Sequence, residues 1–353
     1  MSDQESTPTQ DPAPPKRSWS NFLIGLHLAA GVVFLVALNL LSLAASRDWA
    51  LDLLTHFRFQ YTAAFAVTGL GLALLKWKRM AGVALLGLLL NLWFVVPLFI
   101  PNADTCLAAE LRGDDTAPSL TLLHVNVNTA NTRKQAVAAM IRDSGAEFVF
   151  LQEINQAWVG AMEGHLDDYR PVKLDPRTDN FGIGLWFREG TAAPEVVSIE
   201  LIDISDGLAQ VNAIDATLKL DTGQTVRILS LHTLPPVSGT YSAARDAQLA
   251  EAARIAASTD GPFILIGDLN ATPWSSDYRA MVRDGGLTDS LRGSGLNGLA
   301  CPGASWPAGM VSLGMIPIDH CLTRNGAVVV ERTLGDANGS DHRPLFVEIR
   351  LAE

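Results

Sequence analysis

Polar side chains that can bind a metal ion or a phosphate stand at the ends of apolar runs along this sequence. They are carboxylates, carboxamides and imidazoles: Asn126 and Asn128, Glu153, His232, Asp268 and Asn270, Asp319 and His320, and Asp341 and His342. A buried strand that ends in such a residue presents it at the edge of a sheet, where active sites are commonly assembled. Together these residues favour catalysis with a hard cation.

Each residue alone has a plainer explanation. An Asn or Asp after a strand is more often a turn residue, and a lone His is more often at the surface or satisfied in a core. The set lacks a Cys nucleophile and a Gly-x-Ser-x-Gly elbow, and its oxygen ligands select Mg²⁺ or Mn²⁺ over zinc. Cys106, Cys301 and Cys321 show no metal-ligand spacing. Unpaired thiols are favoured over a disulfide between Cys301 and Cys321.

The elements that must position these residues alternate along the second part of the chain. Strand-like runs occur at 119–126, 147–152, 182–187, 195–202, 209–219, 225–232, 263–267, 328–333 and 345–351, and helical patterns at 133–143, 242–258 and 276–284. Thr132 and Gln135 have the spacing of a capping box at the start of the first helix. Consecutive strands joined by hairpins, with helices over the sheets, predict a layered α/β sandwich of mixed sheets.

Six short motifs, in this order, resemble those of the endonuclease/exonuclease/phosphatase superfamily. That superfamily includes deoxyribonuclease-I-like nucleases, abasic-site endonucleases, neutral sphingomyelinases and inositol-phosphate phosphatases. The motifs are the segments 126–128, 151–154, 231–233, 267–273, 318–320 and 340–345. The resemblance extends from about Ser119 to the C-terminus. With apolar runs ahead of the domain, the chain is similar to a membrane-bound bacterial branch of the superfamily.

The resemblance implies a four-layer α/β/β/α sandwich of two mixed sheets and the hydrolysis of phosphoesters with Mg²⁺ or Mn²⁺. Glu153 corresponds to the principal metal ligand, with Asp341 and Asn128 near the ion. Asn126 and Asn270 would donate amide hydrogens to the scissile phosphate. Abasic-site enzymes carry an Asp where this chain has Asn128, which argues against two tightly bound metal ions.

The resemblance also implies roles for the remaining acids and histidines. Asp268 would orient or deprotonate the attacking water, and Asp319 would hold His342 in its working orientation. His342 would contact the phosphoryl oxygens or act as a base, and His232 would bind the phosphate and protonate the leaving group. Such groups supply general acid–base catalysis and charge stabilisation without a covalent intermediate.

Three apolar runs precede this domain, at Phe22–Ala45, Tyr61–Leu75 and Ala81–Ile100. About 20 apolar residues are needed to cross a bilayer as a helix, so we expect three transmembrane helices within residues 21–100. The second run spans only if Phe59 and its neighbours contribute and Arg58 snorkels outward. The alternatives are a cleaved signal peptide for the first run and a buried or interfacial helix for the second.

The basic residues predict an orientation. Lys16 and Arg17 precede the first run, and Lys76, Lys78 and Arg79 separate the second from the third. Because basic loops stay in the cytoplasm, the N-terminus is expected there, and the catalytic domain (118–353) on the periplasmic or extracellular side of the inner membrane. Residues 1–20 read as a disordered tail and 101–117 as a tether.

The substrate stays open between extracellular nucleic acid and a phospholipid headgroup, and no protein partner is inferable. The net charge of −11 disfavours long nucleic acid, whose binding depends on Lys and Arg, and tethering to a bilayer favours lipid. The naming of the superfamily favours a nuclease. A catalytically silent, membrane-tethered binding module is the alternative of a different class, and the complete set of site residues argues against it.

Overall fold

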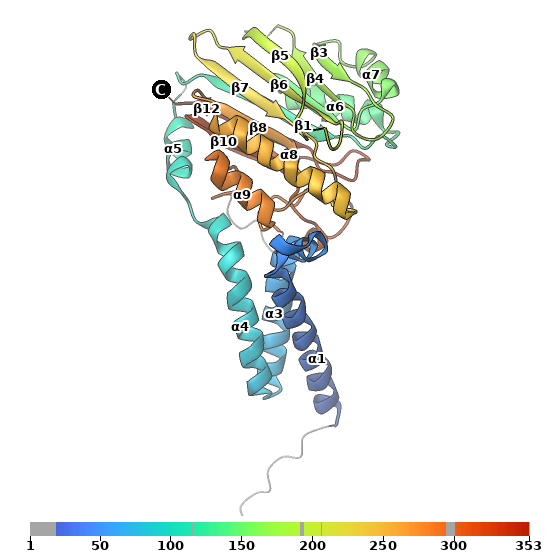
Figure 1. The fold of residues 1–353 in the computed structure, drawn as a ribbon, viewed down its shortest axis with the longest axis vertical. Coiled ribbons are helices and arrows are strands. Elements are labelled where there is room, and N and C mark those ends of the chain that lie inside the picture. Colours follow the sequence, from blue (N-terminus) through green and yellow to red (C-terminus); the bar gives the residue numbers. More distant parts are fainter. Residues whose placement is uncertain (1–18, 115, 191–193, 206, 294–300, 353) are drawn as a thin grey trace, which may run out of the picture.

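Two mixed sheets of six strands pack face to face in the C-terminal part of the chain (Figure 1). The computed structural model describes residues 19–352 except 115, 191–193, 206 and 294–300. The predicted disordered tail lies outside the described residues up to position 18. The first sheet consists of β1 (Ser119–Asn126), β2 (Phe148–Gln152), β3 (Tyr169–Asp175), β4 (Ile183–Arg188), β11 (Ala327–Leu334) and β12 (Leu345–Leu351). The second consists of β5 (Glu195–Asp203), β6 (Asn212–Lys219), β7 (Thr225–Ser230), β8 (Phe263–Asp268), β9 (Thr288–Asp289) and β10 (Asp319–Arg324).

The strand order places the predicted site residues near the middle of each sheet. The first sheet has the order β11-β12-β1-β2-β4-β3 and the second β5-β6-β7-β8-β10-β9. β1 and β2 run parallel, as do β7 and β8, so their carboxyl ends meet at one edge of each sheet. β10 runs antiparallel to β8 with Asp319 opposite Asp268, so it presents its first residue at the same edge.

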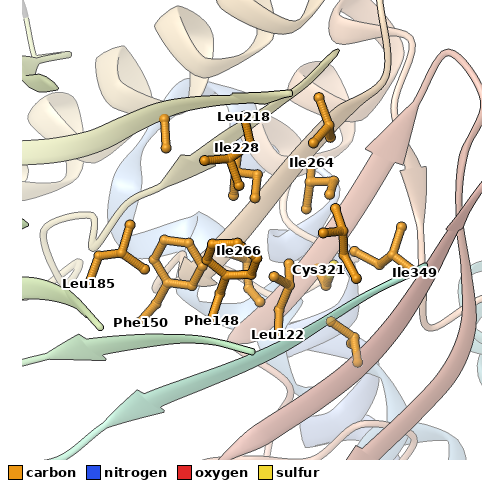
Figure 2. Packing of buried hydrophobic residues seen from close by; sticks show 14 of the residues in the cluster. Leu122, Phe148, Phe150, Leu185, Leu218, Ile228, Ile264, Ile266, Cys321 and Ile349 are labelled. Atoms are coloured by element: carbon orange, nitrogen blue, oxygen red, sulfur yellow. The ribbon is translucent and has the colours of Figure 1, made fainter. Parts of the chain in front are cut away.

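Helices cover the outer face of each sheet and complete the predicted four-layer sandwich. α6 (Lys134–Ser144) and α7 (Gln156–Glu163) pack on the first sheet, and α8 (Gly239–Ala257) and α9 (Ser276–Gly285) on the second. Side chains alternate between two buried faces. In β2, Phe148 and Phe150 enter the core between the sheets (Figure 2). Val149 and Leu151 of the same strand pack under the helices. Burial on both faces explains why the central strands are nearly continuous apolar runs.

Some local expectations were wrong. Thr132 and Gln135 form no capping box, because the helix begins at Lys134 without a side-chain cap. The stretch expected as a tether contains α5 (Ala103–Leu111), which starts with a capping box of Asn102 and Thr105 and packs against β11. The sequence patterns did not indicate α7, β3, β9 or β10. All three cysteines are free, as favoured.

Three N-terminal helices, α1 (Trp19–Ser42), α3 (Arg58–Leu74) and α4 (Lys78–Val95), form a bundle on one side of the sandwich (Figure 1). Two helical stretches, Trp19–Ser42 and Lys78–Leu111, are long and apolar enough to cross a membrane. α3 has 17 residues, fewer than the ~20 that a span requires. Of the three expected spanning helices, only two are therefore candidates by length and composition.

Arg58 does not snorkel outward as expected. It is 1 % exposed, and its Nη1 donates to Oδ1 of Asn39 at 3.0 Å and of Asn91 at 3.4 Å. Its guanidinium also lies 4.3 Å from the ring centroid of Phe94. A buried guanidinium must find acceptors inside the protein, and the two asparagines supply them. Asn91 is buried and faces the other helices.

The connection between α1 and α3 is folded against the sandwich. It consists of η1 (Ala45–Arg47), α2 (Trp49–Asp52) and η2 (Leu53–Phe57); we call residues 45–57 the junction segment. Asp48 caps α2 by accepting a hydrogen bond from the Ala50 amide at 2.8 Å. The junction segment lies between the helical bundle and the sandwich (blue in Figure 1).

Candidate active site

Asn126, the last residue of β1, connects the two sheets at the edge where the site residues gather. Its Nδ2 lies 3.0 Å from Glu153 Oε1 and 3.2 Å from Asp268 Oδ2, and 3.4 Å from His342 Nε2. Glu153 follows β2 of the first sheet, whereas Asp268 ends β8 of the second. One buried carboxamide therefore fixes two carboxylates that belong to different layers.

Gln152 reinforces this connection, although sequence reasoning did not select it. Its Nε2 donates to the Leu231 carbonyl at 2.9 Å, and its Oε1 accepts from the Asp268 amide at 3.1 Å. Gly267 permits the close approach. At its φ of +152° a Cβ would lie 1.9 Å from the Leu231 oxygen, so only glycine fits. The position of Asp268 thus depends on contacts across the sheets.

Glu153 and Asp341 form the carboxylate pair of the site. Glu153 Oε2 accepts from the Thr129 amide at 3.2 Å. Asp341 accepts from Asn128 Nδ2 at 2.7 Å and from Trp306 Nε1 at 3.1 Å. Burial is the main cause that raises the pKa of Glu153, and the nearby charge of Asp341 raises it further.

This pair fits a hard cation. The hydrogen bonds that the two carboxylates accept come from neutral groups, and carboxylate oxygens are the ligands that Mg²⁺ and Mn²⁺ prefer. A cation between them would relieve their mutual repulsion. Asn128 steadies Asp341, and its own Oδ1 accepts from the Ala130 amide at 2.9 Å.

Asp319 lies between two histidines at the bottom of the site. Its Oδ2 is 2.9 Å from His342 Nδ1, and its Oδ1 is 2.8 Å from His124 Nε2. Burial alone would lower the pKa of His342, but Asp319 and then Asp268 raise it to about 10. Burial alone would raise the pKa of Asp319, but His342 and His124 hold it well below its usual range. His342 is therefore an imidazolium at neutral pH, paired with the Asp319 carboxylate.

His124 is a site residue that sequence reasoning missed. It is 0 % exposed and stands inside the apolar run of β1. It belongs to none of the short motifs, so the sequence pattern did not indicate it. One signal was available. His124 and Asn126 are two residues apart in a strand, so they point to the same face. That face lies between the sheets, as the neighbouring Leu122 shows.

His232 lies on the other side of Asp268. Its Nε2 is 3.5 Å from Asp268 Oδ2, its ring centroid is 5.2 Å from that of Phe181, and its buried Nδ1 has no hydrogen-bond partner in the described part of the chain. Burial lowers the pKa of His232 to about 3, so this ring is neutral at neutral pH. Burial also raises the pKa of Asp268.

A second position for a cation also exists. Asp268, Asp319 and His342 each place one ligand atom within 4.8 Å of the others. Both oxygens of Asp319, however, already face histidines, and the imidazolium of His342 supplies the positive charge locally. Glu153 and Asp341 form no ion pair with a basic side chain in the described part of the chain, so this pair fits a metal ion better.

The backbone is strained where three of these residues leave their strands. Asn128, Glu153 and Asn270 have φ angles of +55°, +62° and +44°. Asparagine tolerates the left-handed region, but a glutamate rarely adopts it. Such strain persists where surrounding contacts over-determine the geometry, and it clusters at functional sites.

The structure brings together the nine residues predicted for the site and leaves His320 out. Asn270 belongs to the group through its backbone amide, which donates to Asp268 Oδ1 at 2.9 Å, while its Nδ2 donates to the Thr233 carbonyl at 2.9 Å. Consecutive strand residues point to opposite faces, so His320 points away from Asp319. It lies 3.1 Å from the Tyr278 hydroxyl and 2.9 Å from the Ala271 carbonyl.

Comparisons with known proteins agree with this fold. The model of the Endonuclease/Exonuclease/phosphatase family matches residues 123–342. The solved endonuclease/exonuclease/phosphatase from Bacteroides vulgatus is 17% identical with a TM-score of 0.54, covering 67% of this chain and 100% of that one. Human Nocturnin, solved with bound sulfate, is 17% identical with a TM-score of 0.54, covering 67% and 96%.

A third solved structure has the same fold. D. rerio TDP2, complexed with a single-strand DNA product, is 17% identical with a TM-score of 0.53, covering 66% of this chain and 99% of that one. At these identities the likenesses show the fold. Among curated proteins, none is significantly similar to this chain in sequence.

Proposed function

The chain belongs to the endonuclease/exonuclease/phosphatase family, whose members hydrolyse phosphoesters, and we propose that it is a membrane-anchored hydrolase that depends on Mg²⁺ or Mn²⁺. One observation carries the proposal. The network Glu153–Asn126–Asp268 joins carboxylates of the two sheets, and Asp319 holds His342 beside it. A binding module has no need for this arrangement of buried acids and bases.

Glu153 and Asp341 would hold the metal ion, with Asn128 orienting Asp341. When bound, the ion would neutralise charge on the phosphoryl oxygens and lower the pKa of a water molecule. The negative charge of the two carboxylates, and the neutral donors that fix them, prepare the site for it.

His342 and Asp319 form a preorganised charged donor. Asp319 accepts from Nδ1, so the proton on Nε2 points towards Asp268 and Asn126 and is available to a phosphoryl oxygen. Because Asp319 raises the pKa of His342 to about 10, this proton stays in place at neutral pH. Hydrogen bonds aimed at developing charge commonly make the greatest contribution to such catalysis.

Asp268 is the proposed proton acceptor for the attacking water. Burial raises its pKa, which brings it closer to the pKa that suits a general base near neutral pH. Its Oδ1 is held by the Asn270 amide and its Oδ2 by Asn126. His232, neutral and with a free Nδ1, would bind the phosphate first and take up a proton for the leaving group only once negative charge lies beside it.

The arrangement of the helices supports anchoring in a membrane with the site outside the cytoplasm. The start of α1 and the turn between α3 and α4 lie at the end of the bundle far from the sandwich (Figure 1). Lys76 lies in that turn, and the basic residues Lys78 and Arg79 begin α4. If the basic end faces the cytoplasm, the junction segment and the catalytic domain lie on the opposite side of the inner membrane.

Hydrolysis by the full-length protein in detergent tests the proposal. Plasmid DNA, sphingomyelin and bis(p-nitrophenyl) phosphate, each with Mg²⁺ or Mn²⁺, cover the substrate classes. At least one is expected to be hydrolysed, EDTA is expected to abolish the reaction, and His342→Ala to reduce it by at least about 100-fold.

Glu153→Gln tests the metal site more sharply. It is expected to raise the metal concentration that gives half-maximal activity. The increase should exceed the roughly 10- to 100-fold loss of metal affinity that follows when a residue hydrogen-bonded to a metal ligand is removed. Glu163→Gln, an exposed glutamate at the end of α7, is the matched control and should behave as wild type. Activity that persists in EDTA, or that is unchanged in Glu153→Gln, would contradict the assignment.

A further inference from the structure

A mostly apolar cavity of about 270 Å³ lies next to the candidate active site. One wall comes from the junction segment, with Leu53, His56 and Phe57. The other comes from the catalytic domain, with residues 235–237, Ile316 and Ile318. The cavity therefore exists only because the N-terminal region and the catalytic domain meet there.

Polar contacts fix the wall contributed by the junction segment. Asp52 accepts from Arg245 Nη2 at 3.0 Å, from Ser275 Oγ at 3.1 Å and from the Ser276 amide at 3.2 Å. His56 Nδ1 lies 3.1 Å from Thr272 Oγ1. Thr272, Ser275 and Ser276 follow closely after Asp268 and Asn270, and Arg245 contacts the Asn270 carbonyl. The wall is therefore attached to the segment that carries Asp268 and Asn270.

The start of α3 adds a further attachment beside the cavity. Gln60 Nε2 donates to the carbonyls of Leu313 and Met315 at 3.1 and 3.0 Å. Asp52, His56 and Gln60 belong to three successive elements, α2, η2 and α3, and each of them contacts the catalytic domain. The cavity is thus a built feature with anchored walls.

The cavity opens onto the residues that handle phosphate. Asn270 and Trp306 line it. Trp306 donates from Nε1 to Asp341 at 3.1 Å, and its ring centroid is 6.5 Å from that of His342. A substrate whose phosphate sits at His342 and Asp341 would place a substituent of that phosphate directly in the cavity.

Exposed apolar side chains surround the cavity on the side of the helical bundle. Phe57 and Val237, which line it, are 40% and 68% exposed. Between the lining residues Trp306 and Ile316, the chain exposes Met310, Val311 and Leu313 by 54%, 77% and 42%. Soluble surfaces seldom gather apolar residues in this way, and such a rim is typical of a membrane contact.

The geometry points to a lipid: the cavity takes the hydrocarbon part of a phosphoester that enters from the bilayer, while the phosphate reaches Asp341 and His342. This inference rests on the proposed function and names the substrate class. None of the lining residues is a Lys or an Arg, whereas nucleic-acid binding depends on these two residue types. Phe57 and Val237 are exposed and also line the cavity, so the apolar surface reaches into it.

A series of p-nitrophenyl alkyl phosphates tests the inference with the full-length protein in phosphatidylcholine nanodiscs. Water attacks phosphorus, p-nitrophenolate leaves, and only the alkyl group varies from methyl to dodecyl. The ratio of kcat/KM for dodecyl to methyl is expected to exceed 10, since each buried methylene contributes roughly a fourfold factor. A flat series, or faster cleavage of a single-stranded oligonucleotide than of the dodecyl ester, would overturn the inference.

Paired variants separate the cavity from simple partition into the bilayer. Val237→Ser and Leu53→Gln are expected to lower the dodecyl-to-methyl ratio at least threefold. Val197→Ser, at another exposed valine, on β5 (53% exposed), is expected to keep both the ratio and the basal activity. If Val237→Ser and Leu53→Gln both keep the wild-type dodecyl-to-methyl ratio, the result would contradict the role of the cavity.

Photolabelling distinguishes failure of the inference from failure of the proposed function. A dodecyl phosphate with a terminal diazirine, photolysed in the same nanodiscs, is expected to label residues 53–57 and 235–237. Labelling confined to α1, α3 and α4 would reject the cavity as a lipid site. Labelling of the cavity without hydrolysis of any ester would reject the proposed hydrolase and retain the lipid site.

Discussion

Asp319 sets the electrostatics of the candidate site at the scale of single residues. It is 0 % exposed and accepts from His342 and His124. An isolated carboxylate would not remain ionised at such a position, because burial disfavours its charge. The two histidines keep it charged, and its charge in turn keeps His342 protonated. The three side chains therefore function as one unit.

Asp319→Asn is expected to reduce hydrolysis by about 10²- to 10⁴-fold, because the neutral amide no longer stabilises the His342 imidazolium. The rate with saturating Mg²⁺, measured on the same ester for both proteins, is the test. Asp221→Asn, at an exposed turn, controls for loss of one negative charge. A rate for Asp319→Asn within threefold of wild type would show that Asp319 serves packing alone.

The junction segment is the element that links the helical bundle to the catalytic domain. Its contacts are made by buried side chains: Asp52 and His56 are 2% and 4% exposed, and Arg245 is 1% exposed. Arg245 Nη1 also lies 3.4 Å from the Asn270 carbonyl. The junction segment thus braces the loop that carries Asp268 and Asn270, although it precedes the domain by many residues.

Asp52→Ala is expected to destabilise the full-length protein by about 2 to 4 kcal/mol, since it removes one partner of a buried ion pair and leaves the Ser276 amide without its acceptor. Chemical unfolding in a mild detergent, followed by tryptophan fluorescence, measures the change. Asp221→Ala is the control and should stay within about 0.5 kcal/mol of wild type. An equally small effect of Asp52→Ala would mean that the junction segment is only loosely attached.

His56 predicts how stability depends on pH. Burial is the main cause that lowers its pKa from 6.5 to about 4, so the folded protein favours the neutral ring. Its contribution is complete above pH 6.5, where the unfolded chain is also neutral, and is lost as pH falls from 6.5 towards 4. The loss amounts to roughly 3 kcal/mol, since one pKa unit corresponds to about 1.4 kcal/mol.

The matching measurement compares wild type with His56→Asn, whose amide oxygen can take the place of Nδ1 towards Thr272. The wild-type protein is expected to lose more stability between pH 7 and pH 4.5 than the variant does. Burial also lowers the pKa of His232 and His320, but these groups contribute equally to both proteins. Parallel stability curves would contradict the prediction.

At the scale of the whole molecule, the bundle and the sandwich place the candidate site close to the expected membrane surface. The junction segment lies at the end of the bundle next to the sandwich, and the turn between α3 and α4 lies at the other end (Figure 1). Substrate embedded in the outer leaflet would therefore need to move only a short way to reach the site.

C-terminal fusions test this orientation. A fusion to alkaline phosphatase is expected to be active in cells, because that enzyme folds only outside the cytoplasm. A fusion to green fluorescent protein, which fluoresces on the cytoplasmic side, is expected to be dark. The reverse pattern would place the catalytic domain in the cytoplasm and would remove the support for an extracytoplasmic substrate.

Local sequence patterns were sufficient to predict the layers of the domain and most of the residues that gather at the candidate site. Local signals were enough for this, because apolar runs mark strands and amphipathic patterns mark helices. Residues such as Glu153, Asp268 and His342 stand in short motifs at strand ends, and parallel or facing strands bring such ends together. Boundaries agree within a few residues for β1, β8 and α9.

The side chains that hold the site residues in position could be identified only from the tertiary structure. His124 stands in an apolar strand, and Gln152 matters because it reaches the opposite sheet. Arg58 is buried because Asn39 and Asn91, from two other helices, provide acceptors. The contact between Asp52 and Arg245 joins residues 193 positions apart. Periodicity and motifs report on neighbours in the chain, whereas burial, ion pairing and cavities depend on which distant surfaces pack together.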